Sequence, residues 1–186
     1  MNEFETIKEL KTQRLMLRYV EMDDARGIYS AIQSPEFPEH LPLKEMKTID
    51  EFKEWIKRLQ ELWQTGQAFS WIVEKEGSKE LIGQITLSKM KEGNEYAIAF
   101  WIHPKHWKKG FATEAVKRIL TCVFEELGGE KVWAGAGTWN IRSNRVLEKV
   151  GLKRIRENPE GYPSRGEPIP TIEYEITKKS WVEVRK

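Results

Sequence analysis

The chain has 186 residues, of which 39% are apolar and 32% charged, and its formal net charge is +2. This length and composition predict one folded, water-soluble domain over residues 1–186 and exclude a disordered chain. Acidic and basic residues are mixed along the sequence. The sequence contains no block of basic residues of the kind that binds the phosphate backbone of a nucleic acid. We therefore expect no nucleic-acid partner.

The distribution of cysteine, histidine and apolar residues excludes further kinds of protein. Cys122 is the only cysteine, which rules out an internal disulfide and favours a reducing, cytoplasmic location. The N-terminus is polar, unlike a secretory signal, and no apolar run is long enough to span a bilayer, so we expect no membrane partner. His40, His103 and His106 show no metal-ligand spacing with cysteine or with paired acids, so we expect no metal.

The first half of the chain predicts two helices among several strands. Alternation over residues 14–20 predicts a strand, and the acids at 23–24 can cap a helix that ends near Gln33. Thr48 begins a second helix, in which apolar residues recur at helical spacing as far as Trp63. Turn residues separate three further strand-like runs and predict an antiparallel meander. These runs are 68–74, 81–88 and 95–102.

The second half predicts alternating strands and helices. The helix over 110–127 carries one continuous apolar stripe and is stopped by two glycines. A strand over 131–138 precedes a helix that begins at Asn140 and ends at Gly151. Two last strands, at 152–156 and 171–177, flank a loop rich in proline and glycine. The order of elements predicts a mixed α and β fold.

The first motif that carries chemistry lies at residues 101–115, where a strand, a basic loop and a long helix follow one another. A helix N-terminus offers unpaired N–H donors and the positive end of the helix dipole, so it suits a phosphate group. Gly110 lets the backbone approach the anion, Ala112 keeps the next turn small, and Lys108 and Lys109 add positive charge. An ordinary helix start behind a solvated basic loop is the alternative interpretation.

The second motif lies at residues 140–152, where Asn140 caps a helix and Gly151 ends it. Capping and core packing explain most of these residues. They leave Ser143, in the first turn, without a role beyond local hydrogen bonding to the backbone.

Together these segments resemble the GNAT superfamily of N-acetyltransferases, and in particular its RimJ/RimL-like branch. The segment WKKGFATEA resembles that branch's pyrophosphate loop, and NIRSNRVLEKVGL resembles its second cofactor helix. The opening TQRLMLRYVEMDDA and the closing IEYEITKKSW also resemble the ends of the branch, so the resemblance covers nearly the whole chain.

The resemblance implies a mixed, mostly antiparallel sheet of about seven strands, splayed at a cofactor cleft and flanked by about four helices. It implies transfer of an acetyl group from acetyl-CoA to a primary amine by direct attack in a ternary complex. The amine would be a protein N-terminal α-amine or a small molecule. A non-catalytic acyl-CoA-binding module is the alternative, and a nucleotide-binding protein that uses the Gly110 loop differently is a third hypothesis.

The resemblance also implies a set of site residues. The pantetheine arm would pair with strand backbone, backbone amides of the glycine loop would hold the diphosphate, and the second helix would contact pantetheine, thiol and nucleotide. In that order these residues are Phe100, Trp101 and Ile102; Lys108, Lys109, Gly110, Phe111, Ala112 and Thr113; and Asn140 for pantetheine, Ser143 for the thiol, and Arg142 or Arg145 for the nucleotide.

Two departures from the branch affect this picture. Lys108 stands where many relatives have glycine, which is tolerable only if its backbone angles are ordinary. Ala97 stands where many carry an acid. Glu95 shares a strand face with Ala97, so it can replace that acid as the general base, although a solvated carboxylate beside a turn is the alternative. We expect Ser143 to protonate the leaving sulfur.

The acceptor is the least determined part of the sequence. The loops at 34–47 and 158–170 would line its entrance by analogy, and their acidic and aromatic residues suit a cationic amine. These residues are Glu36, Phe37, Glu39 and His40 in the first loop, and Glu160, Tyr162 and Glu167 in the second. A protein N-terminus, a polyamine, an aminoglycoside or another small amine would fit. The loops can equally form a dimer contact, so monomer and homodimer both stay open.

Overall fold

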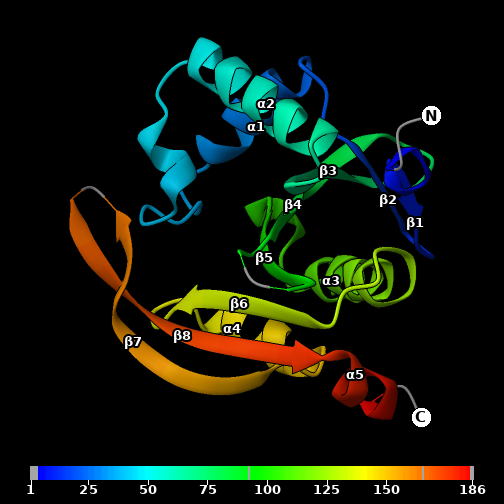
Figure 1. The fold of residues 1–186 in the computed structure, drawn as a ribbon. Helices are drawn as coiled ribbons and strands as arrows, with labels where there is room; N and C mark the ends of the chain where they lie inside the picture. Colours follow the sequence, from blue (N-terminus) through cyan, green and yellow to red (C-terminus); the bar gives the residue numbers. More distant parts are fainter. Residues whose placement is uncertain (1–3, 92, 165, 185–186) are drawn as a thin grey trace.

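A computed structural model describes residues 4–91, 93–164 and 166–184 (Figure 1). Within these residues, eight strands form one sheet in the order β1-β2-β3-β4-β5-β6-β8-β7. Only the β5–β6 pair is parallel. The strands are β1 Glu9–Lys11, β2 Leu15–Tyr19, β3 Ala68–Lys75, β4 Glu80–Lys89, β5 Glu95–Ile102, β6 Lys131–Gly137, β7 Lys153–Ser164 and β8 Glu167–Thr177. The predicted mixed, mostly antiparallel sheet is confirmed, with one strand more than expected.

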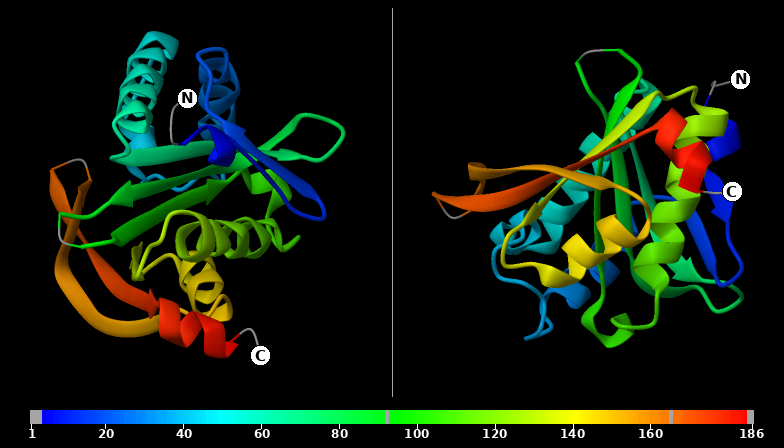
Figure 2. Two further views of the ribbon diagram at one scale, coloured as in Figure 1. Left: turned by 45° about the vertical axis from the view of Figure 1, so that its right-hand side comes forward. Right: turned by 90° about the horizontal axis from the view of Figure 1, so that it is seen from below.

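Helices cover both faces of this sheet (Figures 1 and 2). One face carries α1 and α2, which bury a small apolar core around Phe52, Ile56 and Ile72. The opposite face carries α3 and α4, and its larger core includes Ile119 and Tyr174. The helices are α1 Asp24–Ile32, α2 Ile49–Gln64, α3 Phe111–Thr121, α4 Ile141–Lys149 and α5 Lys178–Val184. No helix among the described residues is long and apolar enough to cross a membrane.

Local sequence explains most helix boundaries. Thr48 caps α2 through a complete capping box, in which its side chain accepts from the Glu51 N–H and Glu51 bonds back to Thr48. Asp23 precedes α1 but makes no side-chain capping bond. Asp24 instead forms an ion pair with Arg18, at 2.6 Å, so the predicted acidic cap is used to join the helix to β2.

The second half contains the main differences from the sequence prediction. The helix expected over 110–127 is α3 followed by a π-helical turn at Cys122–Glu126. The expected loop between the last two strands is instead the outer part of a long β7–β8 hairpin. Proline is tolerated there because β6 pairs with β8 only from Thr171 onward, so the earlier prolines of β8 lie outside that ladder.

Candidate active site

The strands β5 and β6 separate partway along their length. Their parallel ladder holds only three register positions, which end at the pairing of Ala97 with Trp133. Beyond this point β5 continues to Ile102 and β6 to Gly137 without pairing to each other. A gap therefore opens in the sheet at the carboxyl ends of its two parallel strands, as the resemblance implied.

The backbone of β5 presents alternate residues to this gap. The His103 N–H donates to the Ile82 carbonyl and the Met90 N–H donates to the Glu95 carbonyl, so odd-numbered residues of β5 direct their backbone groups toward β4. Since alternate residues point to opposite edges, Ile98 and Phe100 direct theirs into the gap. This edge has the donors and acceptors that an extended pantetheine arm needs.

The three residues predicted to bind pantetheine differ in the direction of their backbone groups. The backbone of Phe100 faces the gap, and so does that of Ile102, although the Ile102 carbonyl already accepts from the Trp107 indole at 2.8 Å. Trp101 follows the odd-numbered register toward β4, and its indole donates to Gln84 at 3.0 Å beneath α1 and α2. Its backbone groups therefore point away from the gap, and its contact with the cofactor stays a prediction.

The glycine loop and the first turn of α3 lie at the end of β5. Gly110 adopts a left-handed conformation, with φ of 81°, and α3 begins at the next residue. The first intrahelical bond runs from the Glu114 N–H to the Gly110 carbonyl. The amides of residues 111–113 precede it and are available to an anion, as expected of a helix N-terminus.

Lys108 does not have the ordinary backbone angles that the sequence analysis required. Its φ is 61°, in the left-handed region, so that condition is not met. A left-handed conformation costs a residue with a Cβ about 1 kcal/mol relative to glycine. The loop therefore holds a lysine, with its charge exposed, in a conformation that glycine would adopt more easily.

The variant Lys108→Gly is expected to raise the free energy of unfolding by about 0.5–1 kcal/mol, because the strain outweighs the added freedom of the unfolded chain. It should also weaken coenzyme A binding a few-fold through loss of one positive charge. Urea denaturation and titration calorimetry measure the two effects. Lys79→Gly is the matched control, since Lys79 has φ of 54° in the β3–β4 turn. It should gain the stability and keep the affinity.

The corner between β6 and α4 is fixed by a hydrogen-bonded pair of side chains that sequence reasoning missed. The Asn144 amide donates to the Gly137 carbonyl at 3.0 Å and to the Asn140 carbonyl at 2.9 Å. The buried Tyr174 hydroxyl in turn donates to the Asn144 side chain. Asn140 caps α4 by accepting from the Ser143 N–H. Asn140 and Ser143 are thus held at the end of β6, beside the gap.

Arg142 and Arg145 have different surroundings. The Arg142 guanidinium lies over the Trp107 ring, 4.2 Å from its centroid, and so joins α4 to the glycine loop. A hollow of about 380 Å³ lies here, and Lys108 lines it too. Arg145 is exposed farther along α4. Of the two arginines predicted for the nucleotide, the structure brings only Arg142 to the loop.

Glu95 is the first residue of β5 and lies away from the gap. Its carboxylate forms an ion pair with Lys131 at 2.9 Å, where β5 and β6 are still paired. Phe100 lies roughly 16 Å farther along the strand. The structure therefore does not bring Glu95 to the gap, and its predicted role as general base lacks the required proximity.

The sheet face under α1 and α2 is lined by small residues at the gap. Ala97 and Ala99 share the face of Trp101 by alternation, and Ala99 is exposed. On β6, the Trp133 indole lies over Gly135, where an added Cβ would approach it to 2.8 Å. At Ala99 this face of β5 therefore carries only a methyl group, whereas Trp101 on the same face is buried under α1 and α2.

The two loops predicted to line the acceptor entrance meet at one tryptophan. Trp139 follows β6, and its ring centroid lies 5.5 Å from that of His40 in the loop between α1 and α2. Its side chain also hydrogen-bonds to Tyr162 of β7, whose pKa is raised by burial and lowered in part by that bond. An aromatic wall thus borders the face that carries Ala99.

Burial shifts the pKa values of the cysteine and of two histidines. Burial raises the pKa of Cys122 to about 12, so its thiol stays protonated and inert. Burial also lowers the pKa values of His103 and His106, which stay neutral at neutral pH. The part of the chain that the structure describes contains no cluster of three or more His, Cys, Asp or Glu residues suited to a metal ion.

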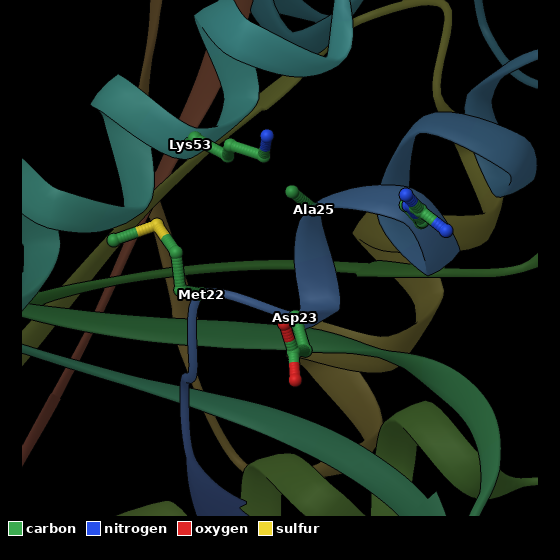
Figure 3. Close-up of a pocket in the computed structure, with 5 residues that line it drawn as sticks. Met22, Asp23, Ala25 and Lys53 are labelled. Atoms are coloured by element: carbon green, nitrogen blue, oxygen red, sulfur yellow. The ribbon is translucent and has the colours of Figure 1, made fainter.

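A second, larger hollow lies away from the gap, between the start of α1 and α2 (Figure 3). Its volume is about 460 Å³, and it is lined by Met22, Asp23, Ala25, Arg26 and Lys53. All of these except Ala25 are exposed, and none belongs to β5, α3 or α4. We therefore assign the chemistry to the gap and not to this hollow.

An open strand edge that leads to a helix N-terminus suits an extended ligand that carries phosphate groups. The model of the acetyltransferase (GNAT) domain matches residues 14–153. YoaA of Bacillus subtilis (strain 168), described as an uncharacterized N-acetyltransferase, is 31% identical over 170 residues, which are 91% of this chain and 96% of that protein. The chain belongs to the GNAT family and is an acetyl-CoA-dependent N-acetyltransferase.

Solved structures agree on the fold. A GNAT-family acetyltransferase from Bacillus anthracis superposes with a TM-score of 0.80 at 23% identity, and covers 92% of this chain and 99% of its own. RimJ of Mycobacterium smegmatis, in complex with CoA-disulfide, gives a TM-score of 0.76 at 20% identity, with coverage of 92% and 89%. These two likenesses show that the chain shares the fold of both proteins.

Proposed function

We propose that the protein transfers an acetyl group from acetyl-CoA to a primary amine, with both bound together at the β5–β6 gap. The observation that supports this most is the unpaired edge of β5, which leads into the glycine loop and the free amides of α3. Acetyl-CoA, when bound, supplies an activated acetyl thioester. Phe100 would hold the pantetheine arm, residues 108–113 the diphosphate, and Asn140 the end nearer the thiol.

The amine must be neutral to attack. An α-amino group titrates near 8 and a lysine near 10.4, so roughly a tenth of the former and under a thousandth of the latter is neutral at pH 7. This difference favours a protein N-terminus or a small amine of low pKa. The small residues around Ala99 would admit the amine from the face under α1 and α2, past the wall formed by His40, Trp139 and Tyr162.

Two groups of the chain would act on the reacting atoms. The N–H of Ile98 or Phe100, which faces the gap, would donate to the developing oxyanion. Ser143 would give its hydroxyl proton to the leaving sulfur and regain one from water, which carries the proton released by the amine, since Ser143 occupies the first turn of α4 beside the gap. Proton removal from the amine would pass through water, because the side chain at position 97 is a methyl group.

The variant Glu95→Gln is expected to leave kcat and the pH dependence of kcat/KM unchanged within about twofold, because the carboxylate is paired with Lys131 at the closed end of the gap. Initial rates from about pH 6 to pH 9 test this expectation. If the variant instead lost the acidic limb of the pH–rate profile, which reports deprotonation of the general base, Glu95 would act as that base.

An acetyl-transfer screen tests the function directly. Peptides with free N-termini, the same peptides with blocked N-termini, and small primary amines are incubated with acetyl-CoA, and thiol release and product mass are followed. Acetylation of the free but not the blocked peptides would identify an α-amine acceptor. Coenzyme A binding without transfer to any amine would instead favour the non-catalytic binding module, the alternative raised by Ala97. Absence of coenzyme A binding would overturn the proposal.

A further inference from the structure

We propose that Arg14, immediately before β2, is a positioning residue that turns the amide of Gly110 toward the diphosphate of coenzyme A. This inference depends on the proposed function, in which the glycine loop binds that diphosphate. It assigns a role in cofactor binding to a residue far from both sequence motifs. The role is indirect, because Arg14 acts through the backbone of the loop.

The Arg14 side chain contacts three parts of the α3 N-terminus. Its Nη1 donates to the Lys109 carbonyl at 3.0 Å. Its Nε donates to the Glu114 carboxylate at 2.7 Å, and Nη2 lies 2.6 Å from the same oxygen. The guanidinium also lies over the Phe111 ring, 4.7 Å from its centroid. One planar fork therefore holds the loop, the first turn and the helix together.

The bond to Lys109 fixes the orientation of a peptide group. The described chain has no cis peptide bond, and in a trans peptide the carbonyl and the following N–H point in opposite directions. Because Arg14 holds the Lys109 carbonyl on the β2 side, the Gly110 N–H must point away from β2. This amide then joins those of residues 111–113 as a donor to an anion.

The Glu114 carboxylate holds both the backbone and the side chain of Arg14 in place. One carboxylate oxygen accepts from the Arg14 N–H at 2.9 Å and from the Thr12 hydroxyl at 2.6 Å. Burial raises the pKa of Glu114, but the bonds from Thr12 and Arg14 outweigh it and keep the carboxyl ionised. Arg14 also neutralises this charge, which would otherwise repel a phosphate from the first turn.

The left-handed residues of the loop give Arg14 a further role. Lys108 and Gly110, on either side of Lys109, both have positive φ. For Lys108, which has a Cβ, such a conformation persists only where neighbouring contacts hold it. The Lys109 carbonyl is the loop group that Arg14 grips, so loss of the fork should let this peptide rotate and withdraw the Gly110 N–H.

The variant Arg14→Met, which keeps an aliphatic stem without donors, tests the inference. Titration calorimetry with coenzyme A should show the Kd raised about tenfold, as expected for loss of a charge-assisted bond and its preorganisation. The kcat/KM with S-acetylpantetheine, which lacks the diphosphate, should stay within about twofold of wild type. Arg118→Met is the matched control, because Arg118 pairs with Glu126 at 2.7 Å at the far end of α3.

A second variant tests the same inference if Arg14→Met folds poorly. Arg14→Lys keeps the charge, but one ammonium group cannot hold Glu114 and the Lys109 carbonyl as a planar guanidinium does. The Kd of this variant for coenzyme A should therefore lie between the values of wild type and Arg14→Met. An unchanged Kd for coenzyme A, or equal losses with coenzyme A and with S-acetylpantetheine, would overturn the role of Arg14 alone. Wild-type protein that fails to bind coenzyme A would overturn the proposed function along with it.

Discussion

Replacing Ser143 with alanine is expected to lower kcat about 100-fold, the usual effect of losing a general acid, while the Kd for coenzyme A changes less than twofold. The affinity should survive because the capping bond of α4 uses the Ser143 backbone N–H, which alanine also has. The expected change therefore falls on the transition state, where the sulfur needs a proton, and not on ground-state binding.

Steady-state kinetics with saturating acetyl-CoA, together with calorimetry on the same preparations, measures both quantities. Ser30→Ala, an exposed serine on α1, is the matched control and should equal wild type. If Ser143→Ala turns over at the wild-type rate, another group or water protonates the sulfur. An equal loss of affinity and turnover would instead indicate that Ser143 only holds the cofactor.

Replacing Ala99 with tryptophan is expected to lower kcat/KM for the amine about 100-fold, because the indole would cover the face through which the acceptor reaches the thioester. Ala99 is exposed, and its backbone groups point toward β4, so the sheet and the open edge of β5 should tolerate the change. The Kd for coenzyme A should therefore stay within about threefold of wild type, since residues 108–113 and α4 are unaltered.

Ala99→Ser, which adds one hydroxyl, is the control for the change of residue itself and should keep most of the activity. The two readouts are acceptor saturation curves at fixed acetyl-CoA and calorimetric binding of coenzyme A. Wild-type use of the amine by Ala99→Trp would show that the acceptor approaches from another side, and the aromatic wall at Trp139 would then lose its assignment.

The helices and the central strands were predictable because their patterns are local. The stripe of α2 and its Thr48 cap lie within one segment, and β5 was predicted with the bounds that the structure shows. The β7–β8 hairpin was not, because prolines normally end strands and only the missing β6 partner makes them tolerable there. β1 also escaped prediction, since three residues are too few to show alternation.

The site divides in the same way. Gly110, Asn140 and Ser143 were predictable because they belong to two contiguous motifs. Arg14 and Tyr174 were not, because each acts on a residue that only the folded chain brings near: Arg14 on Lys109, and Tyr174 on Asn144. The direction of the Trp101 backbone toward β4 was not predictable either, because its motif does not show which strand edge receives its backbone groups.

The short parallel ladder between β5 and β6 also has a mechanical meaning. On each side of it the strands are joined by antiparallel ladders, and across it the sheet is held by three register positions and by the helices beneath. At this junction the two strands already diverge after the pairing of Ala97 with Trp133. Small rotations of the two halves of the sheet about this junction would widen or narrow the gap while every antiparallel strand pair stays intact. Acyl-CoA donors and amines of different size would then fit without the unfolding of any strand.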